Sequence, residues 1–247
     1  MKYRDLVFDL YGTLVDIHTE TDTEAVWEKT AFYLGFYGAG YMPFELKREY
    51  DALTACLEMD SGQAYECFPE LQMEKVFENL FLKKGISENV KALAINAAQF
   101  FRILSTEYLR LYPGVFHALA ELKKDGHRLW VLSNAQRVFT AYELRYLGLE
   151  GFFEGCYLSS DYGFRKPDKR FFEVLLGERG LRPKDCLMIG NDMTTDIGGA
   201  AGAGFGTFYI HSNLSPADGW ENRTKADHWI RGADWNLIYR KIQKICL

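Results

Sequence analysis

The stretch VFDLYGTLVD, residues 7–16, decides the fold that the rest of the sequence predicts. Its apolar start is typical of a short buried strand, which ends at the carboxylate Asp9 and a turn at Gly12. A carboxylate at the end of a buried strand is costly unless another group pairs with it. For an isolated Asp, capping of the turn made by Gly12 and Thr13 would be the simpler interpretation. Partners for Asp9 elsewhere in the chain would instead favour a functional site.

Downstream of residue 112, short apolar runs alternate with stretches of helical periodicity. We predict five further strands, at residues 128–132, 156–158, 186–189, 205–210 and 228–230, the last at an edge. We predict helices at residues 115–124, 135–147, 169–179, 197–203 and 237–246. Strands that alternate with helices predict an α/β fold: a Rossmann-like, doubly wound parallel sheet with helices on both faces.

Between the first strand and this α/β pattern lies a block of different character. From Thr19 to Leu109 the sequence shows no strand pattern, and helical periodicity dominates. The predicted helices cover residues 19–34, 44–57 and 73–84, and a long helix capped by Ser87, whose apolar stripe continues to Tyr108. Four helices with one apolar face each predict a small helical bundle. We therefore expect an α/β core of residues 1–15 and 112–247, and an inserted all-α domain of residues 16–111.

Aromatic residues and glycines are concentrated between the first two predicted helices, in the segment FYLGFYGAGYMPF, residues 32–44. One interpretation is a turn between two helices, with the aromatic side chains in the core of the bundle. The other is a mobile, aromatic wall over a ligand site. The sequence leaves both interpretations open.

Composition and charge exclude several classes of protein. The 247 residues carry a formal net charge of −5 with scattered Lys and Arg, so they lack the basic footprint of a nucleic-acid-binding protein. Five cysteines without CxxC spacing favour a reducing compartment over a disulfide frame or a zinc site. The apolar run before Asp9 is too short for a signal peptide, and no apolar run is long enough to span a bilayer. We expect a cytoplasmic protein that acts on a small molecule, without nucleic-acid or membrane partners.

Reactive side chains recur where the predicted strands end, and these carboxyl ends are where a doubly wound sheet binds its ligands. The positions are Asp9, Ser133 with Asn134, Lys166, and the group Asn191, Asp192 and Asp196. Each has a simple explanation on its own, such as a helix cap, a solvated loop charge or a favourable charge at a helix N-terminus. Four such positions at one edge of a sheet are much less expected by chance. They favour a functional site around Asp9.

Four segments together carry a resemblance to a known family. They are FDLYGTL (residues 8–14), LSNA (132–135), RKPD (165–168) and GNDMTTDIGGA (190–200). In this combination and order the chain resembles the haloacid dehalogenase-like hydrolase superfamily. The position of the helical block resembles the members whose helical cap is inserted after the first of these motifs. The resemblance covers the whole chain and implies a hydrolase with a Rossmann-like core and a helical cap.

The resemblance also implies roles for the residues at the strand ends. Asp9 would be the nucleophile and would form a covalent aspartyl intermediate. Ser133, with Asn134, would hold an oxygen of the transferred group, and Lys166 would offset the charge of the nucleophile. The implied Mg2+ ligands are Asp9, the backbone carbonyl of Tyr11, Asp192 and Asp196.

The chemistry of phosphoryl transfer suits these residue types. A carboxylate that attacks a phosphate must overcome the repulsion between like charges, and a Lys and Mg2+ beside it lower that barrier. A hard cation prefers oxygen ligands such as carboxylates and carbonyls. Hydrolysis in two displacements through Asp9 is ordinary covalent catalysis. We therefore expect Mg2+-dependent hydrolysis of a phosphomonoester or phosphoanhydride.

Tyr11 departs from the pattern of the family's phosphatases, most of which carry a second Asp at this position. A phenol has an ordinary pKa near 10 and is a poor general base at neutral pH. Tyr at this position resembles the family's metal-independent 2-haloacid dehalogenases, which displace halide from carbon. Phe172 and Met193, however, replace a Tyr and an Asn of those enzymes, and Asp192 adds an acid that a dehalogenase does not need.

Three main hypotheses remain after the sequence, beside the hydrolysis of another substrate with a good leaving group, such as an acyl phosphate, that needs little protonation. A Mg2+-dependent phosphohydrolase is the first, and a 2-haloacid dehalogenase-like hydrolase of carbon–halogen bonds is the second. The third belongs to another class: a ligand-binding module that has lost turnover. Retention of Asp9, Ser133, Lys166 and Asp196 together speaks against the third, while Tyr11 speaks mildly for it.

Overall fold

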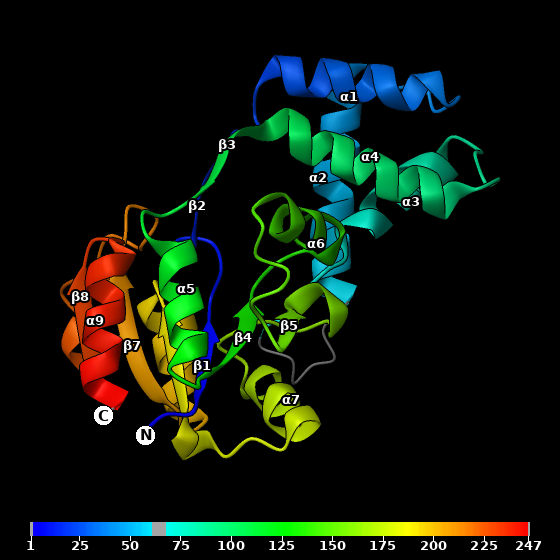
Figure 1. The fold of residues 1–247 in the computed structure, drawn as a ribbon. Helices are drawn as coiled ribbons and strands as arrows, with labels where there is room; N and C mark the ends of the chain where they lie inside the picture. Colours follow the sequence, from blue (N-terminus) through cyan, green and yellow to red (C-terminus); the bar gives the residue numbers. More distant parts are fainter. Residues whose placement is uncertain (1, 61–67, 247) are drawn as a thin grey trace.

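A computed structural model describes residues 2–60 and 68–246 of the chain, apart from the side chains of residues 58–60. Its centre is a six-stranded sheet in the order β5-β4-β1-β6-β7-β8, in which all neighbouring strands are parallel (Figure 1). The strands are β1 (Asp5–Phe8), β4 (Arg128–Ser133), β5 (Gly155–Leu158), β6 (Cys186–Gly190), β7 (Gly206–His211) and β8 (His228–Arg231). The predicted parallel sheet and its edge strand are confirmed.

The register of the sheet places the predicted site residues at one edge. Phe8, the last residue of β1, pairs with Val131 of β4 on one side and with Ile189 of β6 on the other. β1 ends at this level, while β6 continues by one residue to Gly190 and β4 by two residues to Ser133, so the three strand ends lie together at the carboxyl edge. This position brings Asp9 between the ends of β4 and β6.

Helices cover both faces of the sheet. The helices of the core are α5 (Val115–Lys124), α6 (Arg137–Tyr146), α7 (Lys169–Arg179), α8 (Gly199–Gly202) and α9 (Trp235–Cys246). Leu6 and Phe8 of β1 pack in one core cluster with apolar residues of α5 and α9. Val7, which points to the opposite face, packs in a second cluster with α7 and α8. This doubly wound arrangement confirms the predicted fold class.

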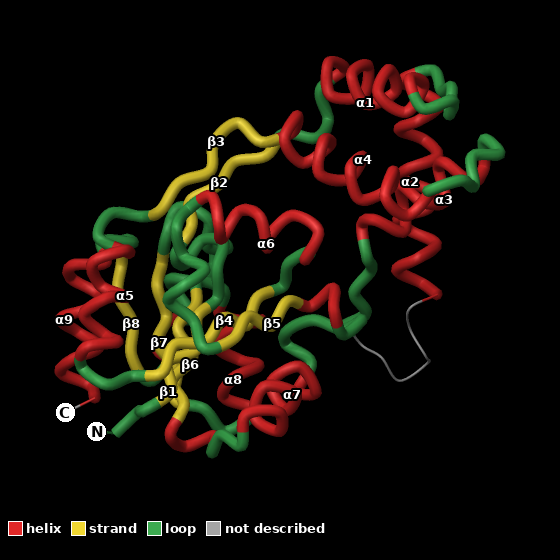
Figure 2. The backbone as a smooth tube through the Cα atoms, turned by 45° about the vertical axis from the view of Figure 1, so that its right-hand side comes forward, coloured by secondary structure: helices red, strands yellow, loops and turns green. Residues whose placement is uncertain are grey.

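Four helices form a separate cluster between β1 and α5. They are α1 (Glu24–Phe36), α2 (Pro43–Asp60), α3 (Met73–Lys83) and α4 (Val90–Ser105), which we call the helical insertion. Trp27, Leu34, Phe77, Phe81 and Phe101 are buried in its own hydrophobic core. The helical insertion lies beside the sheet, near α6, in both views (Figures 1 and 2). Val138 of α6 is the core residue that joins this cluster.

Two strands that the sequence analysis did not predict link the two parts. β2 (Val15–Thr19) and β3 (Thr106–Leu111) form an antiparallel ribbon, in which Val15 pairs with Leu111 (Figure 2). The predicted helix through Tyr108 is therefore wrong at its end, because α4 stops at Ser105. The hydroxyls of Ser105 and Thr106 donate to the carbonyl of Arg102 and so offer the backbone an alternative to the next helical turn.

Two helix starts also differ from the prediction. α1 begins at Glu24 because Thr19 belongs to β2, and the residue that precedes α4 is Asn89 rather than Ser87. Asn89 has a φ of 52°, a left-handed conformation that Asn tolerates better than most residues. The sequence pattern identified each helix but misplaced its first turn.

The aromatic segment of residues 32–44 is mostly at the surface. Phe32, Phe36 and Phe44 are 78%, 78% and 71% exposed, so their interpretation as core residues is wrong. Tyr41 is held to α3 by a hydrogen bond from its hydroxyl to the carbonyl of Leu80. The segment contributes none of the residues that line the hollow beside Lys166 described below.

The cysteines and the lengths of the helices bear on two predictions made from composition. Cys56, Cys156, Cys186 and Cys246 are free thiols, and Cys67 lies outside the described residues. Within residues 2–60 and 68–246, none of the helices combines the length and the apolar character that crossing a bilayer requires.

Candidate active site

Asp9 lies at the carboxyl end of β1, where the structure brings its predicted partners together. Its backbone N–H donates to the carbonyl of Ile189 at 3.0 Å, which fixes the start of the loop. Its Oδ1 accepts hydrogen bonds from Ser133 Oγ at 2.9 Å and from Lys166 Nζ at 2.8 Å. Among the described residues, the one hydrogen bond to its Oδ2 is longer, 3.3 Å from Thr13 Oγ1. Asp9 is therefore held firmly through one oxygen, while Oδ2 keeps lone pairs for a ligand.

Lys166 is buried, 1% exposed, and its ammonium group has three acceptors for its three protons. Nζ donates to Asp9 Oδ1, to the carbonyl of Leu132 at 2.8 Å and to Asp196 Oδ1 at 2.6 Å. Burial alone would lower the pKa of Lys166, but the carboxylates of Asp196 and Asp9 raise it above its usual value. The lysine therefore stays charged and neutralises part of the negative charge at the site.

Asp196 is the second carboxylate that Lys166 contacts, and it is also buried. Its Oδ2 accepts the backbone N–H groups of Asn191 and Asp192, both at 3.0 Å. Burial raises the pKa of Asp196 to about 7, against the opposing effect of Lys166. This shift favours the neutral acid, whereas the shift of Lys166 favours the ion pair. The 2.6 Å contact and the two N–H donors stabilise the ionised form, so we assign the pair as charged at neutral pH.

Asn191 and Asp192 follow β6 and point in different directions. Asn191 is buried, and its Oδ1 accepts a hydrogen bond from Thr13 Oγ1 at 3.2 Å. The same hydroxyl contacts Asp9, so the side chain of Asn191 lies toward Asp9. Asp192 Oδ1 accepts the N–H groups of Thr194 and Thr195, at 2.7 and 2.8 Å, and so caps the helical segment that begins at Met193. Sequence reasoning favoured Asp192 as a metal ligand because it is an acid, but Asn191 is the side chain turned toward Asp9.

Gly12 is required by the close approach of the loop after Asp9 to Asn191. Its φ is 82°, and a Cβ atom at this position would lie 2.3 Å from Asn191 Nδ2. Gly232 has a similar φ of 86° but no atom within 4 Å of such a Cβ. The two glycines therefore share the backbone conformation and differ in the available space.

We expect Gly12→Ala to lower the free energy of unfolding by about 1–3 kcal/mol more than Gly232→Ala does. Both variants pay the left-handed backbone penalty, but only the first must displace Asn191. Urea denaturation of the two variants and the parent protein measures the difference. Equal losses would show that the loop yields without cost.

Tyr11 is placed away from Asp9, against α6. Its hydroxyl forms hydrogen bonds with Thr140 Oγ1, at 2.9 Å, and with the carboxylate of Glu143. Arg102, from the end of α4, pairs with that carboxylate through Nε at 2.7 Å, and its guanidinium lies 5.6 Å from the centroid of the Tyr11 ring. Burial first, and the charge of Glu143 second, raise the pKa of Tyr11 well above its usual value. Tyr11 is therefore a neutral phenol under ordinary conditions.

Sequence reasoning missed Thr140, Glu143 and Arg102 altogether. Thr140 and Glu143 are three positions apart on α6 and so share one face, but nothing in the sequence links that face to residue 11. Arg102 belongs to the largely apolar helix α4, where an occasional charged residue such as Lys91 or Arg102 is ordinary. Only the packing of the helical insertion near α6 identifies the three as one group.

A hollow of about 490 Å³ opens beside Lys166 at the carboxyl edge of the sheet. Its walls include Phe68, Glu70, Asn134, Gln136, Arg165 and Thr194. Glu70 precedes α3 and accepts from Gln136 Nε2 at 3.0 Å and from Ser159 Oγ at 2.6 Å. Asn134 uses both ends of its amide on the backbone of Lys166, at 2.8 and 3.0 Å. The predicted substrate residue Asn134 thus serves to hold the Lys166 loop.

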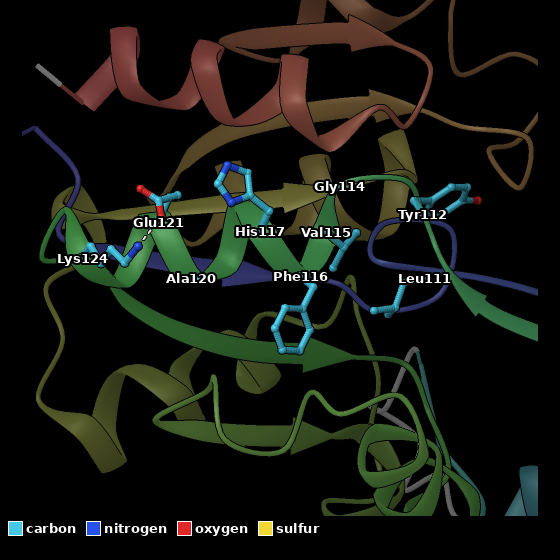
Figure 3. A pocket seen from close by; sticks show the side chains of 9 residues that line it. All are labelled: Leu111, Tyr112, Gly114, Val115, Phe116, His117, Ala120, Glu121 and Lys124. Atoms are coloured by element: carbon cyan, nitrogen blue, oxygen red, sulfur yellow. Dashed lines mark hydrogen bonds and ion pairs between the residues drawn. The ribbon is translucent and has the colours of Figure 1, made fainter.

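A second hollow, of about 600 Å³, lies on the other side of the core, along α5 (Figure 3). Figure 3 shows Phe116 and His117 on this helix, with Glu121 paired to Lys124 further along. None of its lining residues is a predicted site residue. The hollow along α5 is lined by side chains typical of a surface helix, and it plays no part in the site at Asp9.

Side chains around Asp9 supply oxygen donors of the kind that Mg2+ prefers. Among residues 2–60 and 68–246, no group of three or more His, Cys, Asp or Glu side chains is arranged to hold a metal. Mg2+, however, often binds through one or two carboxylates and several waters. The carboxylate of Asp9 and Asn191 Oδ1 are hard oxygen donors that both lie beside Thr13 Oγ1. The donor set therefore fits a hydrated Mg2+ centred on Asp9.

Comparison with known proteins gives consistent matches. The model of a family described as haloacid dehalogenase-like hydrolase matches residues 4–204. A glyceraldehyde 3-phosphate phosphatase of Methanothermobacter thermautotrophicus is 30% identical over 67% of this chain and 76% of that protein. An (S)-2-haloacid dehalogenase of Burkholderia cepacia is 24% identical over 87% of this chain and 86% of that protein. Among solved structures, the HAD-hydrolase YfnB of Bacillus subtilis has a similar fold, with a TM-score of 0.57, 21% identity and coverage of 98% and 100%.

Proposed function

This chain belongs to the haloacid dehalogenase-like hydrolases, and we propose that it uses Asp9 as a nucleophile to hydrolyse a phosphorylated small molecule with the help of Mg2+. The observation that carries the proposal is the environment of Asp9. Its Oδ1 is fixed by Ser133 and Lys166, and its Oδ2 keeps lone pairs for attack. A relative named as a phosphatase supports this choice of reaction.

In the proposed reaction, Asp9 Oδ2 attacks the phosphorus atom and the bond to the leaving group breaks. A water molecule then attacks the phosphorus of the aspartyl phosphate and restores Asp9. With substrate bound, Ser133 Oγ would turn its hydrogen bond from Asp9 Oδ1 to a phosphoryl oxygen, and the ammonium group of Lys166 reduces the repulsion between Asp9 and the phosphate. Asp196 keeps Lys166 charged and in place through the 2.6 Å contact.

Mg2+ would be held by Asp9, the backbone carbonyl of Tyr11 and Asn191, with waters at the remaining positions. When bound, it would neutralise negative charge on the phosphoryl group. Asp196 would act through Lys166, because both of its oxygens already accept hydrogen bonds. Asp192 would remain the cap of the segment after it.

Residues 16–111 would serve as a cap over the site. Phe68 and Glu70, which precede α3, line the hollow beside Lys166 and support this role. The backbone of residues 68–70 is attached to the loop before Lys166, because Arg165 N donates to the carbonyl of Phe68 and Glu70 N to that of Gly163. A cytoplasmic location would suit the odd number of cysteines in the sequence.

The second candidate is hydrolysis of a carbon–halogen bond, favoured by Tyr11, whose phenol does not reach Asp9. A relative named as a 2-haloacid dehalogenase agrees with it. A paired assay separates the candidates: phosphate release from a panel of phosphate esters and anhydrides, and halide release from 2-chloropropionate, each with Mg2+ or EDTA. We expect EDTA-sensitive phosphate release. Halide release that EDTA does not affect would establish the second candidate, and inactivity in both assays would favour a binding module.

Titration calorimetry with Mg2+ tests the proposed metal ligands directly. We expect binding to the parent protein at millimolar concentration or tighter, and at least about tenfold weaker binding to Asp9→Asn, because a carboxylate ligand is lost. Asp192→Asn separates the two neighbours, since its Oδ1 is engaged in the cap. A loss of affinity in Asp192→Asn as large as in Asp9→Asn would make Asp192 the ligand in place of Asn191.

A further inference from the structure

The network around Tyr11 limits the chemistry that the site can perform. Tyr11 is the one titratable side chain in residues 10–15, the loop that follows Asp9. Its hydroxyl is held by Glu143 and Thr140, and Glu143 is held by Arg102. We propose that this network withdraws Tyr11 from Asp9, so that the enzyme acts on acyl phosphates and similar compounds whose leaving group departs as a stable anion. This inference rests on the proposed phosphohydrolase function.

The network is rigid enough to keep Tyr11 where it is. The Arg102–Glu143 pair is largely buried, with side chains 20% and 11% exposed. It joins α4 of the helical insertion to α6 of the core, so both parts hold Glu143 in place. A swing of Tyr11 toward Asp9 would remove its hydrogen bonds from Thr140 and from the Glu143 carboxylate inside this buried region. Such losses are unfavourable because polar groups buried without partners are costly.

No other acid among the described residues is positioned to replace Tyr11. The side-chain contacts of Asp9 are Thr13, Ser133 and Lys166, and the three donors of Lys166 already have acceptors. Asp196 is buried behind Lys166 with both oxygens bonded. The titratable residues that line the described part of the hollow are Glu70, Arg165 and Lys166, and Glu70 accepts from Gln136 and Ser159. Among residues 2–57 and 68–246, a proton for the leaving oxygen therefore has no source in contact with Asp9.

The bond changes follow from this arrangement. The Asp9 Oδ2–phosphorus bond forms while the bond from phosphorus to the leaving oxygen breaks, and that oxygen takes the electron pair. A carboxylate, which leaves from an acyl phosphate, is stable in water without a proton. An alkoxide, which leaves from an alkyl phosphate, is not and needs a proton in the transition state. In the second step, the proton of the attacking water passes to phosphate or bulk water.

A leaving-group series with the full-length protein and Mg2+ tests the inference. The substrates are acetyl phosphate, p-nitrophenyl phosphate, phenyl phosphate and ethyl phosphate, each followed by phosphate release. We expect kcat/KM to fall in this order, by about 100-fold or more between acetyl and ethyl phosphate after correction for their uncatalysed rates, because general acid catalysis is worth about that much. Equal corrected rates would overturn the inference and leave the proposed function intact. Inactivity with all four substrates would instead refute the proposed function.

Two substitutions at residue 11 test the cause. Tyr11→Asp places an acid on the loop and is expected to raise kcat/KM for ethyl phosphate relative to acetyl phosphate by about tenfold or more. Tyr11→Phe removes the hydroxyl and is expected to keep the steep dependence, whatever its absolute rate. A selective loss on ethyl phosphate in Tyr11→Phe would show that the phenol supplies the proton and would contradict the inference.

Glu70→Gln tests the one acid among the described residues that line the hollow. We expect it to affect all four substrates alike, because Glu70 is held by Gln136 and Ser159. A selective loss on ethyl phosphate would identify Glu70 as a proton donor and would overturn the inference. Circular dichroism and thermal unfolding establish that each variant is folded, and the series on the parent protein remains decisive if Tyr11→Asp does not fold.

Discussion

Asp9→Asn is expected to lower phosphate release by at least about 1,000-fold, because an amide oxygen cannot replace the carboxylate as nucleophile. The substitution preserves size and leaves Ser133, Thr13 and the backbone contact to Ile189 with partners of the same shape. The loss should therefore appear mainly in kcat. Intact-mass measurement of the acid-quenched parent protein should also reveal an added phosphoryl group that the variant lacks.

Asp5→Asn is the matched control for this substitution. Asp5 lies on the same strand, at its other end, and is equally buried, with Trp130 Nε1 and Arg128 as hydrogen-bond donors at 2.9 and 2.7 Å. We expect Asp5→Asn to cost stability and to retain phosphate release per folded molecule. Asp9→Asn with activity within about tenfold of the parent protein would rule out the covalent mechanism.

Lys166→Met is expected to have the largest effect on stability, about 3–5 kcal/mol in the free energy of unfolding. The substitution removes the cation from between two buried carboxylates, Asp9 and Asp196, and leaves the carbonyl of Leu132 without its donor. Methionine fills a volume similar to that of the lysine side chain but carries no charge. Phosphate release should fall as well, because the like-charge repulsion between Asp9 and the substrate is no longer offset.

The stability loss in Lys166→Met should depend on pH with a definite sign. Lys166 opposes the burial that raises the pKa of Asp196, so its removal raises that pKa further. The folded variant then binds more protons than the unfolded chain between about pH 4 and the raised pKa, and its stability falls as pH increases through that window. Urea denaturation at pH 5.5 and pH 8 should therefore show the larger deficit at pH 8.

Two further variants show whether the stability loss comes from the buried charges around Lys166. Lys169→Met, three residues along, removes an exposed lysine whose partner Glu173 is also exposed, and should cost less than about 0.5 kcal/mol. Adding Asp196→Asn to Lys166→Met removes one unpaired charge and should recover part of the lost stability. A deficit that is the same at both pH values, and that Asp196→Asn does not reduce, would contradict the proposed charge pairing.

The α/β core could be predicted from the sequence because its strands are short apolar runs between clear helix signals. β4 and β6 lie within one residue of their predicted ends, and the polar groups that follow them meet at Asp9. That meeting is a consequence of parallel register, which places the carboxyl ends of neighbouring strands together. The contact of Asp9 with Ser133 therefore follows from topology, whereas Lys166 reaches Asp9 from the loop between β5 and α7.

Other features depend on contacts that no local pattern encodes. The β2–β3 ribbon joins segments that are weakly patterned on their own and become strands by pairing with each other. The choice between Asn191 and Asp192 depends on which side chain caps the next segment, and the structure shows Asp192 accepting the backbone N–H groups of Thr194 and Thr195. The Arg102–Glu143–Tyr11 network could not be predicted, because it depends on how the helical insertion packs relative to α6.

The β2–β3 ribbon also has a consequence for how the sheet assembles. Asp5 of β1 and Arg128 of β4 are neighbours in the sheet but 123 positions apart in the chain. Once Val15 pairs with Leu111, the loop between β1 and β4 is shortened to the segments on either side of the ribbon. The helical insertion then no longer adds to the length of that loop. The entropic cost of bringing β1 and β4 together falls by about 1–2 kcal/mol. The ribbon thus acts as a noncovalent crosslink that shortens the connection between β1 and β4 despite the large insertion.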